Sequence, residues 1–174
     1  MRKLLFKSFV QGPLTEPAPA PDEAALAELA GRVEQAARRR LGRTLAIREV
    51  DAGSCNGCEL EIHALNNVVY DLERFGLRFV ASPRHADVLL VTGPVTANMR
   101  EALERTYLAT PAPKWVVAVG DCGFDGGVFA GSPAVAGGVS AVLPVDLHIR
   151  GCPPSPIVLL KGLLALLESV AEEP

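Results

Sequence analysis

Aromatic residues and long apolar runs are both scarce in this chain of 174 residues. Only 5% of the residues are aromatic although 49% are hydrophobic, so the core must be built mainly from Ala, Val and Leu. The longest apolar run, Ile157–Leu167, is interrupted by Lys161 and falls short of the roughly 18–20 residues that a membrane span needs. The sequence therefore predicts one domain of ordinary size without a membrane-spanning helix.

A strong charge of one sign is also lacking. The chain has 17 Lys and Arg residues against 20 Asp and Glu residues, which gives a net charge of −3 and argues against nucleic acid as a partner. The first ten residues are basic, but Lys7 interrupts their apolar part and no small-residue cleavage site follows, so we expect no secretory signal. A chain that is not exported is expected in the cytoplasm, where cysteines stay reduced.

Proline and glycine mark the divisions of the chain. Residues 12–21 are rich in proline, so residues 1–21 are predicted to form a flexible N-terminal arm. Residues 22–43 are predicted to form a helix, because apolar residues recur at helical spacing between Asp22 and Gly42. Residues 44–170 then form the predicted main domain.

Short apolar runs alternate with helical patterns from residue 45 onward. Strands are expected at Leu45–Val50, Leu77–Val80, Val88–Thr92, Trp115–Val119 and within Val142–Ile149. Helices are expected at Glu59–Phe75, from Thr96 to about Leu108, and from Ser155 onward. This alternation predicts an α/β fold with an open parallel sheet of flavodoxin-like order and helices on both faces, preceded by the N-terminal arm and helix.

The chain has four cysteines, and each lies in a glycine-bearing turn shortly after an expected strand. Cys55 and Cys58 follow the first strand, Cys122 follows the fourth, and Cys152 follows the fifth. Because the carboxyl ends of parallel strands meet at one rim of the sheet, all four thiols can reach one site. Cys58 also lies in the first turn of an expected helix, where the helix dipole favours the thiolate. Four thiols at one site are typical of an iron–sulfur cluster.

Three alternatives use the same cysteines. A structural zinc site more often has two C-x-x-C pairs, whereas this chain has only the pair Cys55 and Cys58. A thioredoxin-type redox pair would use those two thiols and leave Cys122 and Cys152 without a role. Two disulfides do not suit a chain that is not exported. The iron–sulfur interpretation gives all four thiols a function.

Several sequence strings together carry a resemblance to a known family. They are C-N-G-C-E-L-E-I at the first cysteines, D-L-E-R-F-G at 71–76, S-P-R-H-A-D at 82–87, V-T-G-P at 91–94 and G-C-P-P at 151–154. Through them the stretch from about Ile47 to Leu167 resembles the cluster-bearing small subunit, the 20 kDa subunit family, that energy-converting nickel–iron hydrogenases share with respiratory complex I. The C-x-x-C spacing is similar to that of formate hydrogenlyase and related membrane-bound hydrogenases, whereas the complex I members are expected to carry adjacent cysteines.

The resemblance implies an electron-transfer subunit in an oxidoreductase complex. One 4Fe–4S cluster would be held by Cys55, Cys58, Cys122 and Cys152. It would relay electrons to or from the nickel–iron site of a separate hydrogenase large subunit, with a ferredoxin-like iron–sulfur subunit as a further partner. The chain would lie on the inner face of the cell membrane through its partners, including the membrane arm of the complex. The corresponding subunit of a complex I-type NADH-quinone oxidoreductase, whose cluster donates electrons to quinone, is an alternative, and a zinc-stabilised interaction module is another.

The resemblance also implies roles for residues near the cysteines. Glu61 occupies the position of a family acid close to the cluster and could couple cluster charge to a proton or to a partner, while Glu59 is expected to face solvent. Arg84 and His85 are either interface residues or part of a charged loop. Asp121, where the family leads us to expect a small or hydroxyl residue, should lower the reduction potential of the cluster.

The histidines, by contrast, are not expected to bind a metal. His63 and His148 have no other His, Asp or Glu residue at ligand spacing. The predicted ligand set is therefore made of cysteines alone.

Overall fold

The computed structural model describes residues 23–169, so the predicted N-terminal arm lies outside the described residues. The helices are α2 (Glu23–Leu41), α3 (Gly57–Ala64), α4 (Ala97–Ala109), α5 (Gly120–Asp125) and α6 (Pro156–Ser169). The strands are β1 (Leu45–Asp51), β2 (Leu77–Phe79), β3 (Val88–Thr92), β4 (Val95–Thr96), β5 (Trp115–Val119), β6 (Val135–Gly137) and β7 (Leu147–Ile149). Short 3₁₀ turns are η1 (Leu72–Phe75), η2 (Pro83–His85), η3 (Gly127–Phe129) and η4 (Val139–Ala141).

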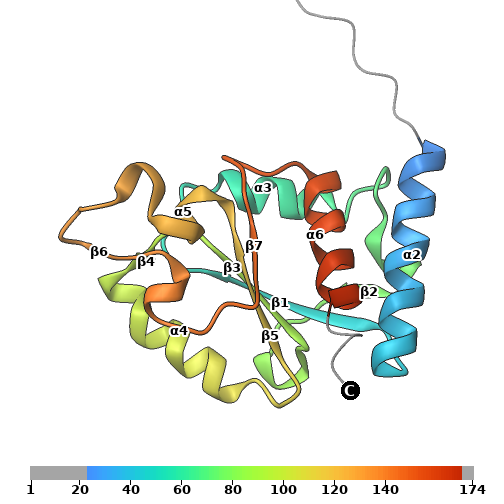
Figure 1. Ribbon diagram of the computed structural model, residues 1–174, viewed down its shortest axis with the longest axis horizontal. Coiled ribbons are helices and arrows are strands. Elements are labelled where there is room, and N and C mark those ends of the chain that lie inside the picture. The colour runs from blue at the N-terminus through green and yellow to red at the C-terminus, as the bar shows by residue number, and fades with distance from the viewer. Residues whose placement is uncertain (1–22, 170–174) are drawn as a thin grey trace, which may run out of the picture.

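A five-stranded parallel sheet forms the centre of the molecule (Figure 1). Its strand order is β2-β1-β3-β5-β7, and every neighbouring pair is parallel. This is the flavodoxin-like order that the alternating sequence pattern predicts. Helices α2, α3 and α6 pack with one face of the sheet and α4 with the other, so the predicted fold class is confirmed.

Strand β3 shows why its sequence is a continuous apolar run. Val88 and Leu90 belong to the core on the side of α2, α3 and α6, while Leu89 and Val91 belong to the core on the side of α4. All five residues of the strand are buried, as expected for a parallel strand covered on both faces.

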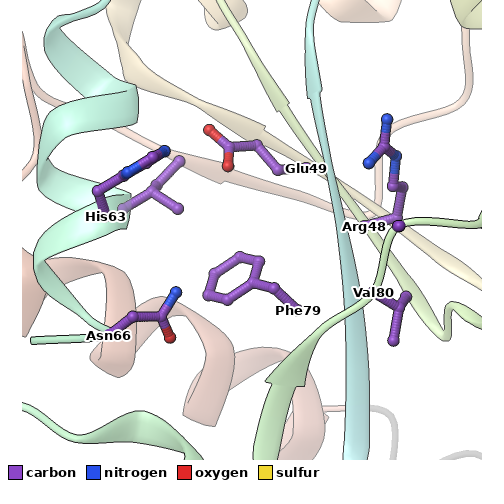
Figure 2. Close-up of a pocket in the computed structure, with 8 residues that line it drawn as sticks. Arg48, Glu49, His63, Asn66, Phe79 and Val80 are labelled. Carbon is purple, nitrogen blue, oxygen red and sulfur yellow. The ribbon is translucent and has the colours of Figure 1, made fainter.

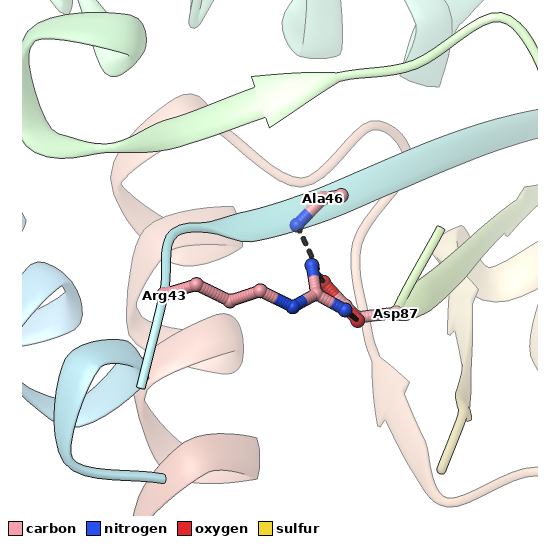
Figure 3. A network of polar contacts seen from close by, with 3 residues as sticks. All are labelled: Arg43, Ala46 and Asp87. Carbon is pink, nitrogen blue, oxygen red and sulfur yellow. Dashed lines mark hydrogen bonds and ion pairs between the residues drawn. The ribbon is translucent and has the colours of Figure 1, made fainter. Parts of the chain in front are cut away.

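The N-terminal helix α2 packs against α6 and contributes to the first core through buried residues such as Val33 and Ala37. Just beyond α2, Arg43 forms two hydrogen bonds with the buried carboxylate of Asp87, of 3.0 and 2.5 Å (Figure 3). Asp87 Oδ2 also accepts the backbone N–H of Ala46 at 2.9 Å. This contact fixes the chain between α2 and β1 to the start of β3.

The helix expected at Glu59–Phe75 is wrong in its length, because α3 ends at Ala64. Asn67 accepts the backbone N–H groups of Val69 and Tyr70 through its side-chain oxygen, at 2.8 and 3.0 Å. Such a side chain competes with helical hydrogen bonds and starts a turn. Asp71 then adopts a left-handed conformation with φ 42°, and only the short 3₁₀ turn η1 follows.

Two further elements differ from the sequence-based expectation. The strand expected within Val142–Ile149 is confined to the three residues of β7, since Pro144 lies before it and η4 occupies Val139–Ala141. The small antiparallel pair of β4 and β6 was not expected, because neither strand exceeds three residues. Within residues 23–169 we find no helix that combines the length and the apolar character of a membrane span.

Candidate metal centre

The four cysteines lie around one cavity at the carboxyl ends of the parallel strands. The cavity has a volume of about 150 Å³, and its lining includes the following thiol-bearing residues: Cys55, Cys58, Cys122 and Cys152. None of these residues forms a disulfide, and all are at least partly exposed. The fold thus brings together thiols from three separate stretches of the chain, with 63 residues between Cys58 and Cys122.

The loop after β1 carries the first two cysteines. Asp51, the last residue of β1, accepts the backbone N–H groups of Gly53 and Ser54 at 2.7 Å each, which turns the chain sharply toward the cavity. Cys55 lies in the loop that follows, and Cys58 lies in the first turn of α3. The sequence-based placement of Cys58 on a helix N-terminus is therefore correct.

Cys122 and Cys152 lie on neighbouring strand ends. Cys122 belongs to the short helix α5, which begins directly after β5, so its surroundings are helical where we expected a turn. Gly126 closes this helix with φ 94° and donates its N–H to the carbonyl of Cys122 at 2.9 Å. Cys152 follows β7 by three residues, and its peptide bond to Pro153 is cis.

Two glycines make room for the sulfur atoms. Gly120 has φ +83°, and a Cβ atom there would lie 2.7 Å from the Sγ of Cys58. Gly127 has φ +51°, and a Cβ atom there would lie 2.9 Å from the Sγ of Cys122. Both positions favour glycine by conformation and by space, so the backbone forms a close cradle around the thiols.

Two of the thiols are held in the protonated form when no metal is bound. Burial, reinforced by the charge of Glu59 and then by the other three cysteines, raises the pKa of Cys58 to about 12. Burial also raises the pKa of Cys122 above its usual value. Burial at Cys58 thus opposes the thiolate that we expect the helix N-terminus to favour. A metal must displace these protons when it binds.

Asp121 lines the same cavity and is paired with a cation. Its Oδ1 accepts Arg150 Nε at 2.5 Å and the backbone N–H of Gly151 at 3.3 Å. The hydrogen bond from Arg150, followed by that from Gly151, holds the pKa of Asp121 below its usual value. The carboxylate is therefore ionised at neutral pH, and its charge is balanced by a guanidinium.

Of the two acids of α3, Glu59 is placed differently from our expectation. Glu59 is buried, with 7% of its surface exposed, and neither of its carboxylate oxygens has a hydrogen-bond partner among the described residues. The expectation that Glu59 faces solvent is therefore wrong. Its spacing of three residues from the buried Ile62 is the sequence signal that could have identified its face. Glu61 is half-buried.

A second cavity, of about 260 Å³, lies at the edge of the sheet beside β1 and β2 (Figure 2). Figure 2 shows Glu49 between β1 and His63, with Asn66 and Phe79 beside them. Burial and the charge of Glu59 raise the pKa of Glu49, while His63 opposes that shift. His63 therefore belongs to this cavity and is absent from the lining of the thiol cavity.

The remaining predicted positions lie apart from the thiols. His148 packs edge-on against the ring of Phe124, with ring centroids 5.0 Å apart. Arg84 and His85 are exposed on the short turn η2. None of these three side chains lines the thiol cavity.

The candidate donor set consists of four thiols, which are ligands for iron–sulfur clusters and for zinc. A zinc ion needs its sulfur ligands about 2.3 Å away, which draws four thiols tightly around one point. Among residues 23–169 we find no group of three or more His, Cys, Asp or Glu side chains already arranged to hold a metal ion. Four thiols that line one cavity with glycines beside them are the type and number of donors that an iron–sulfur cluster held by four cysteines needs.

Comparison with protein families gives a match over most of the domain. Residues 55–166 match the family described as NADH ubiquinone oxidoreductase, 20 Kd subunit. The matched stretch includes all four cysteines.

Individual relatives include members of hydrogenase and quinone-reductase complexes. A probable membrane-bound hydrogenase subunit, mbhJ, of Pyrococcus furiosus is 46% identical over 132 residues, which cover 76% of this chain and 79% of that protein. Formate hydrogenlyase subunit 7 of Escherichia coli is 45% identical, over 75% of this chain and 52% of that protein. One subunit of the NADH-quinone oxidoreductase of Citrifermentans bemidjiense is 46% identical, over 67% of this chain and 68% of that protein.

The fold also matches a solved structure. One chain of the membrane-bound sulfane sulfur reductase, an archaeal respiratory membrane complex, superposes with a TM-score of 0.66 and 33% identity, over 80% of this chain and 75% of that one. The likeness thus holds in three dimensions as well as in sequence.

Proposed function

This chain belongs to the NADH ubiquinone oxidoreductase 20 Kd subunit family, and we propose that it is the electron-transfer subunit of a membrane-associated hydrogenase complex. The observation that carries the proposal is the convergence of four thiols from three strand ends on one cavity. Four thiols gathered in this way, with no disulfide between them, are suited to hold a metal cluster.

We propose that the cavity holds one 4Fe–4S cluster, with Cys55, Cys58, Cys122 and Cys152 as its ligands. When bound, such a cluster accepts and releases electrons at a potential set by its protein surroundings. The chain supplies the four sulfur donors and the glycine backbone that approaches them closely. The nickel–iron chemistry of hydrogen would belong to a separate large subunit.

The surface beside the cavity suits a docked partner. A groove of about 570 Å³ adjoins the thiols, and Cys122, Cys152 and Val128 are among the residues that line it. Val128 is 85% exposed, and the neighbouring Phe124 and Phe129 are also exposed. Exposed apolar side chains beside a metal centre are expected where another protein covers it. We propose that the nickel–iron subunit, or a ferredoxin-like subunit, docks here and holds the chain at the inner face of the membrane.

A second function within the same family is that of a complex I-type subunit whose cluster passes electrons to quinone. The identity to a subunit of NADH-quinone oxidoreductase is 46%, the same as the identity to the membrane-bound hydrogenase subunit. Sequence identity therefore does not separate the two functions. The spacing of Cys55 and Cys58 favours the hydrogenase branch, because the resemblance leads us to expect adjacent cysteines in complex I. Hydrogenase is therefore the function that we put first.

Glu61 is proposed as a coupling residue beside the cluster. It lies on α3, one helical turn after Cys58, and is half-buried. A carboxylate one helical turn away from a proposed ligand can respond to the charge of the cluster or bind a cation of the partner. Glu61 is not a ligand of the cluster in this proposal.

Anaerobic purification of the chain from its source, with its partners attached, tests the proposal. We expect a brown protein with about four irons and four sulfides per copy of this chain at this site. The reduced protein should give an electron paramagnetic resonance signal that disappears when all four cysteines are replaced by serine. One zinc per chain and no colour would instead establish the interaction module.

The identity of the partner separates the two iron–sulfur functions. A nickel-containing protein that copurifies and supports hydrogen evolution would establish the hydrogenase. A partner that lacks nickel and binds quinone would establish the complex I-type function and overturn the hydrogenase assignment.

A further inference from the structure

Asp121 and Gly151 directly precede Cys122 and Cys152. Each of the two residues donates one hydrogen bond to the other. The backbone N–H of Asp121 donates to the carbonyl of Gly151 at 2.9 Å. The backbone N–H of Gly151 donates to Asp121 Oδ1 at 3.3 Å. The same oxygen accepts Arg150 Nε at 2.5 Å. The two cysteine-bearing segments are thus joined one residue before each sulfur.

Arg150 is itself held on a second side. Its guanidinium carbon lies 4.1 Å from the ring centroid of Phe124, within the range of a cation–π contact. The same ring meets His148 edge-on at 5.0 Å. Because Phe124 and Asp121 both belong to α5, while His148 and Arg150 come from the end of β7 and the residue after it, the stack fixes α5 against β7.

The charges of the pair are placed unequally with respect to the thiols. Asp121 lines the thiol cavity, whereas Arg150 is not part of its lining and is exposed. A carboxylate alone at the cavity wall would disfavour the addition of an electron, because it adds negative charge beside a group that becomes more negative. The guanidinium bonded to that carboxylate cancels most of its field.

We propose that the Asp121–Arg150 ion pair is a positioning and charge-balancing clamp of the metal site, an inference that rests on the proposed function. It holds the segments of Cys122 and Cys152 at a fixed separation. It also keeps the potential of the cluster close to that of a site that carries neither of the two charges. Asp121 alone would lower the reduction potential, as the sequence leads us to expect. With Arg150 bonded to it, Asp121 leaves the potential nearly unchanged.

An ordinary surface ion pair is the alternative, since exposed pairs contribute little to stability. Three features set this pair apart: its position one residue before two proposed ligands, the additional backbone hydrogen bonds, and the contact of the cation with Phe124. Arg32–Glu168 is a matched control, because it also joins two distant segments, at 3.2 Å, with both side chains about half exposed.

The test uses the full chain with its cluster, purified anaerobically as wild type and as Arg150→Gln, Arg150→Lys, Asp121→Asn, the double variant Asp121→Asn/Arg150→Gln, and Arg32→Gln. Iron and sulfide are counted, and the midpoint potential is followed by paramagnetic resonance while dithionite supplies one electron at a time. Iron content tests the proposed function, and the pattern of potentials tests the clamp.

We expect Arg150→Gln to lower the equilibrium constant for reduction by a factor of up to about ten, which is 59 mV for a one-electron couple. Asp121→Asn should raise this equilibrium constant, and the double variant should have a value close to that of the wild type. Arg150→Lys and Arg32→Gln should leave the potential unchanged. If the ion pair only stabilised the local structure, the variants would change the iron content, but Arg150→Gln and Asp121→Asn would not shift the potential in opposite directions.

The outcomes separate the two ideas. Wild-type protein without iron would overturn the proposed function, and the clamp with it. Wild-type protein with four irons, whose Arg150→Gln and Asp121→Asn variants have unchanged potentials, would overturn the clamp alone. If Arg150→Gln loses its iron, retention of iron by Arg150→Lys supports the clamp, and loss of iron in that variant too overturns its charge-balancing role.

Discussion

Gly120 and Cys58 come from distant parts of the chain and lie in contact: a Cβ atom on Gly120 would lie 2.7 Å from the Sγ of Cys58. Gly120 is the first residue of α5, and Cys58 lies in the first turn of α3. The cavity therefore depends on the close approach of two helix starts that belong to different strand ends. There is no space for a side chain on Gly120 between these two helix starts.

We expect Gly120→Ala to prevent cluster incorporation. The new methyl group meets the sulfur of Cys58, and φ +83° is a conformation that alanine rarely adopts, so both space and backbone oppose the change. The measurement is the iron content of the anaerobically purified protein, expected to fall from about four atoms to well below one. Full iron content in this variant would show that the two helix starts move apart at little cost.

Gly31→Ala is the matched control, and it should stabilise the protein. Gly31 lies inside α2, and a Cβ atom there would have no neighbour within 4 Å. Alanine in a helix interior is favoured over glycine by about 0.5–1 kcal/mol. Urea unfolding should show a higher midpoint with an unchanged slope, and iron content should stay at the wild-type level. A lower midpoint would mean that the helix needs the glycine for a contact.

Replacement of one proposed ligand should have a different effect from replacement of a nearby histidine. Cys152→Ala should lose the cluster, because three thiols cannot complete a four-cysteine ligand set. His148→Ala should keep it, because this ring packs on Phe124 and does not line the cavity. Iron analysis and the paramagnetic resonance spectrum check both variants. Equal loss of the cluster in both would mean that the ligand set is incomplete.

The Arg43–Asp87 contact should matter for stability. Arg43→Ala leaves the carboxylate of Asp87 buried with the N–H of Ala46 as its partner among the described residues, and we expect the free energy of unfolding to fall by about 2 kcal/mol. Arg32→Ala, at an ion pair whose two side chains are both exposed, should cost less than about 1 kcal/mol. Denaturant unfolding of the two variants gives the comparison. Equal losses would show that the buried carboxylate finds another partner.

The sequence predicted the sheet well because its strands are buried on both faces. The limits of Val88–Thr92 and Trp115–Val119 agree with the structure, since continuous apolar runs bounded by polar turns leave little choice of element. The strand ends then predicted which rim the cysteines share. The order of the strands followed from the alternation of strands and helices along the chain.

What the sequence could not predict depends on contacts between particular side chains. The end of α3 depends on the side chain of Asn67, whose preference for a turn competes with a helical pattern. The burial of Glu59 reverses the usual place of a carboxylate at the surface, and only its spacing from Ile62 hints at it. The pairing of Asp121 with Arg150 joins residues 29 positions apart, and it depends on how the ends of β5 and β7 meet in space.

Glu49 gives a prediction for the pH dependence of stability. Burial, followed by the charge of Glu59, raises the pKa of Glu49 in the folded protein, while His63 opposes the shift; Asp51 adds to it and Arg48 opposes it. The folded state therefore holds this proton at pH values where the unfolded chain, with a carboxyl pKa of about 4.3, has lost it. The stabilisation that results is complete below about pH 4.3 and is lost as the pH rises through the folded-state pKa.

Glu49→Gln removes a carboxylate that is ionised at a cost at neutral pH, so the variant should be more stable than the wild type at pH 7. Its advantage should shrink as the pH falls toward about 4.3, because the wild-type carboxyl group is then protonated as well. Urea unfolding at pH 5 and pH 7 measures this difference, with the exposed Glu73→Gln as a control that should change stability by less than about 0.5 kcal/mol at both pH values. A variant less stable than the wild type at pH 7 would show that the ionised Glu49 is held by a favourable contact, with His63 and Arg48 as the side chains that oppose its pKa shift.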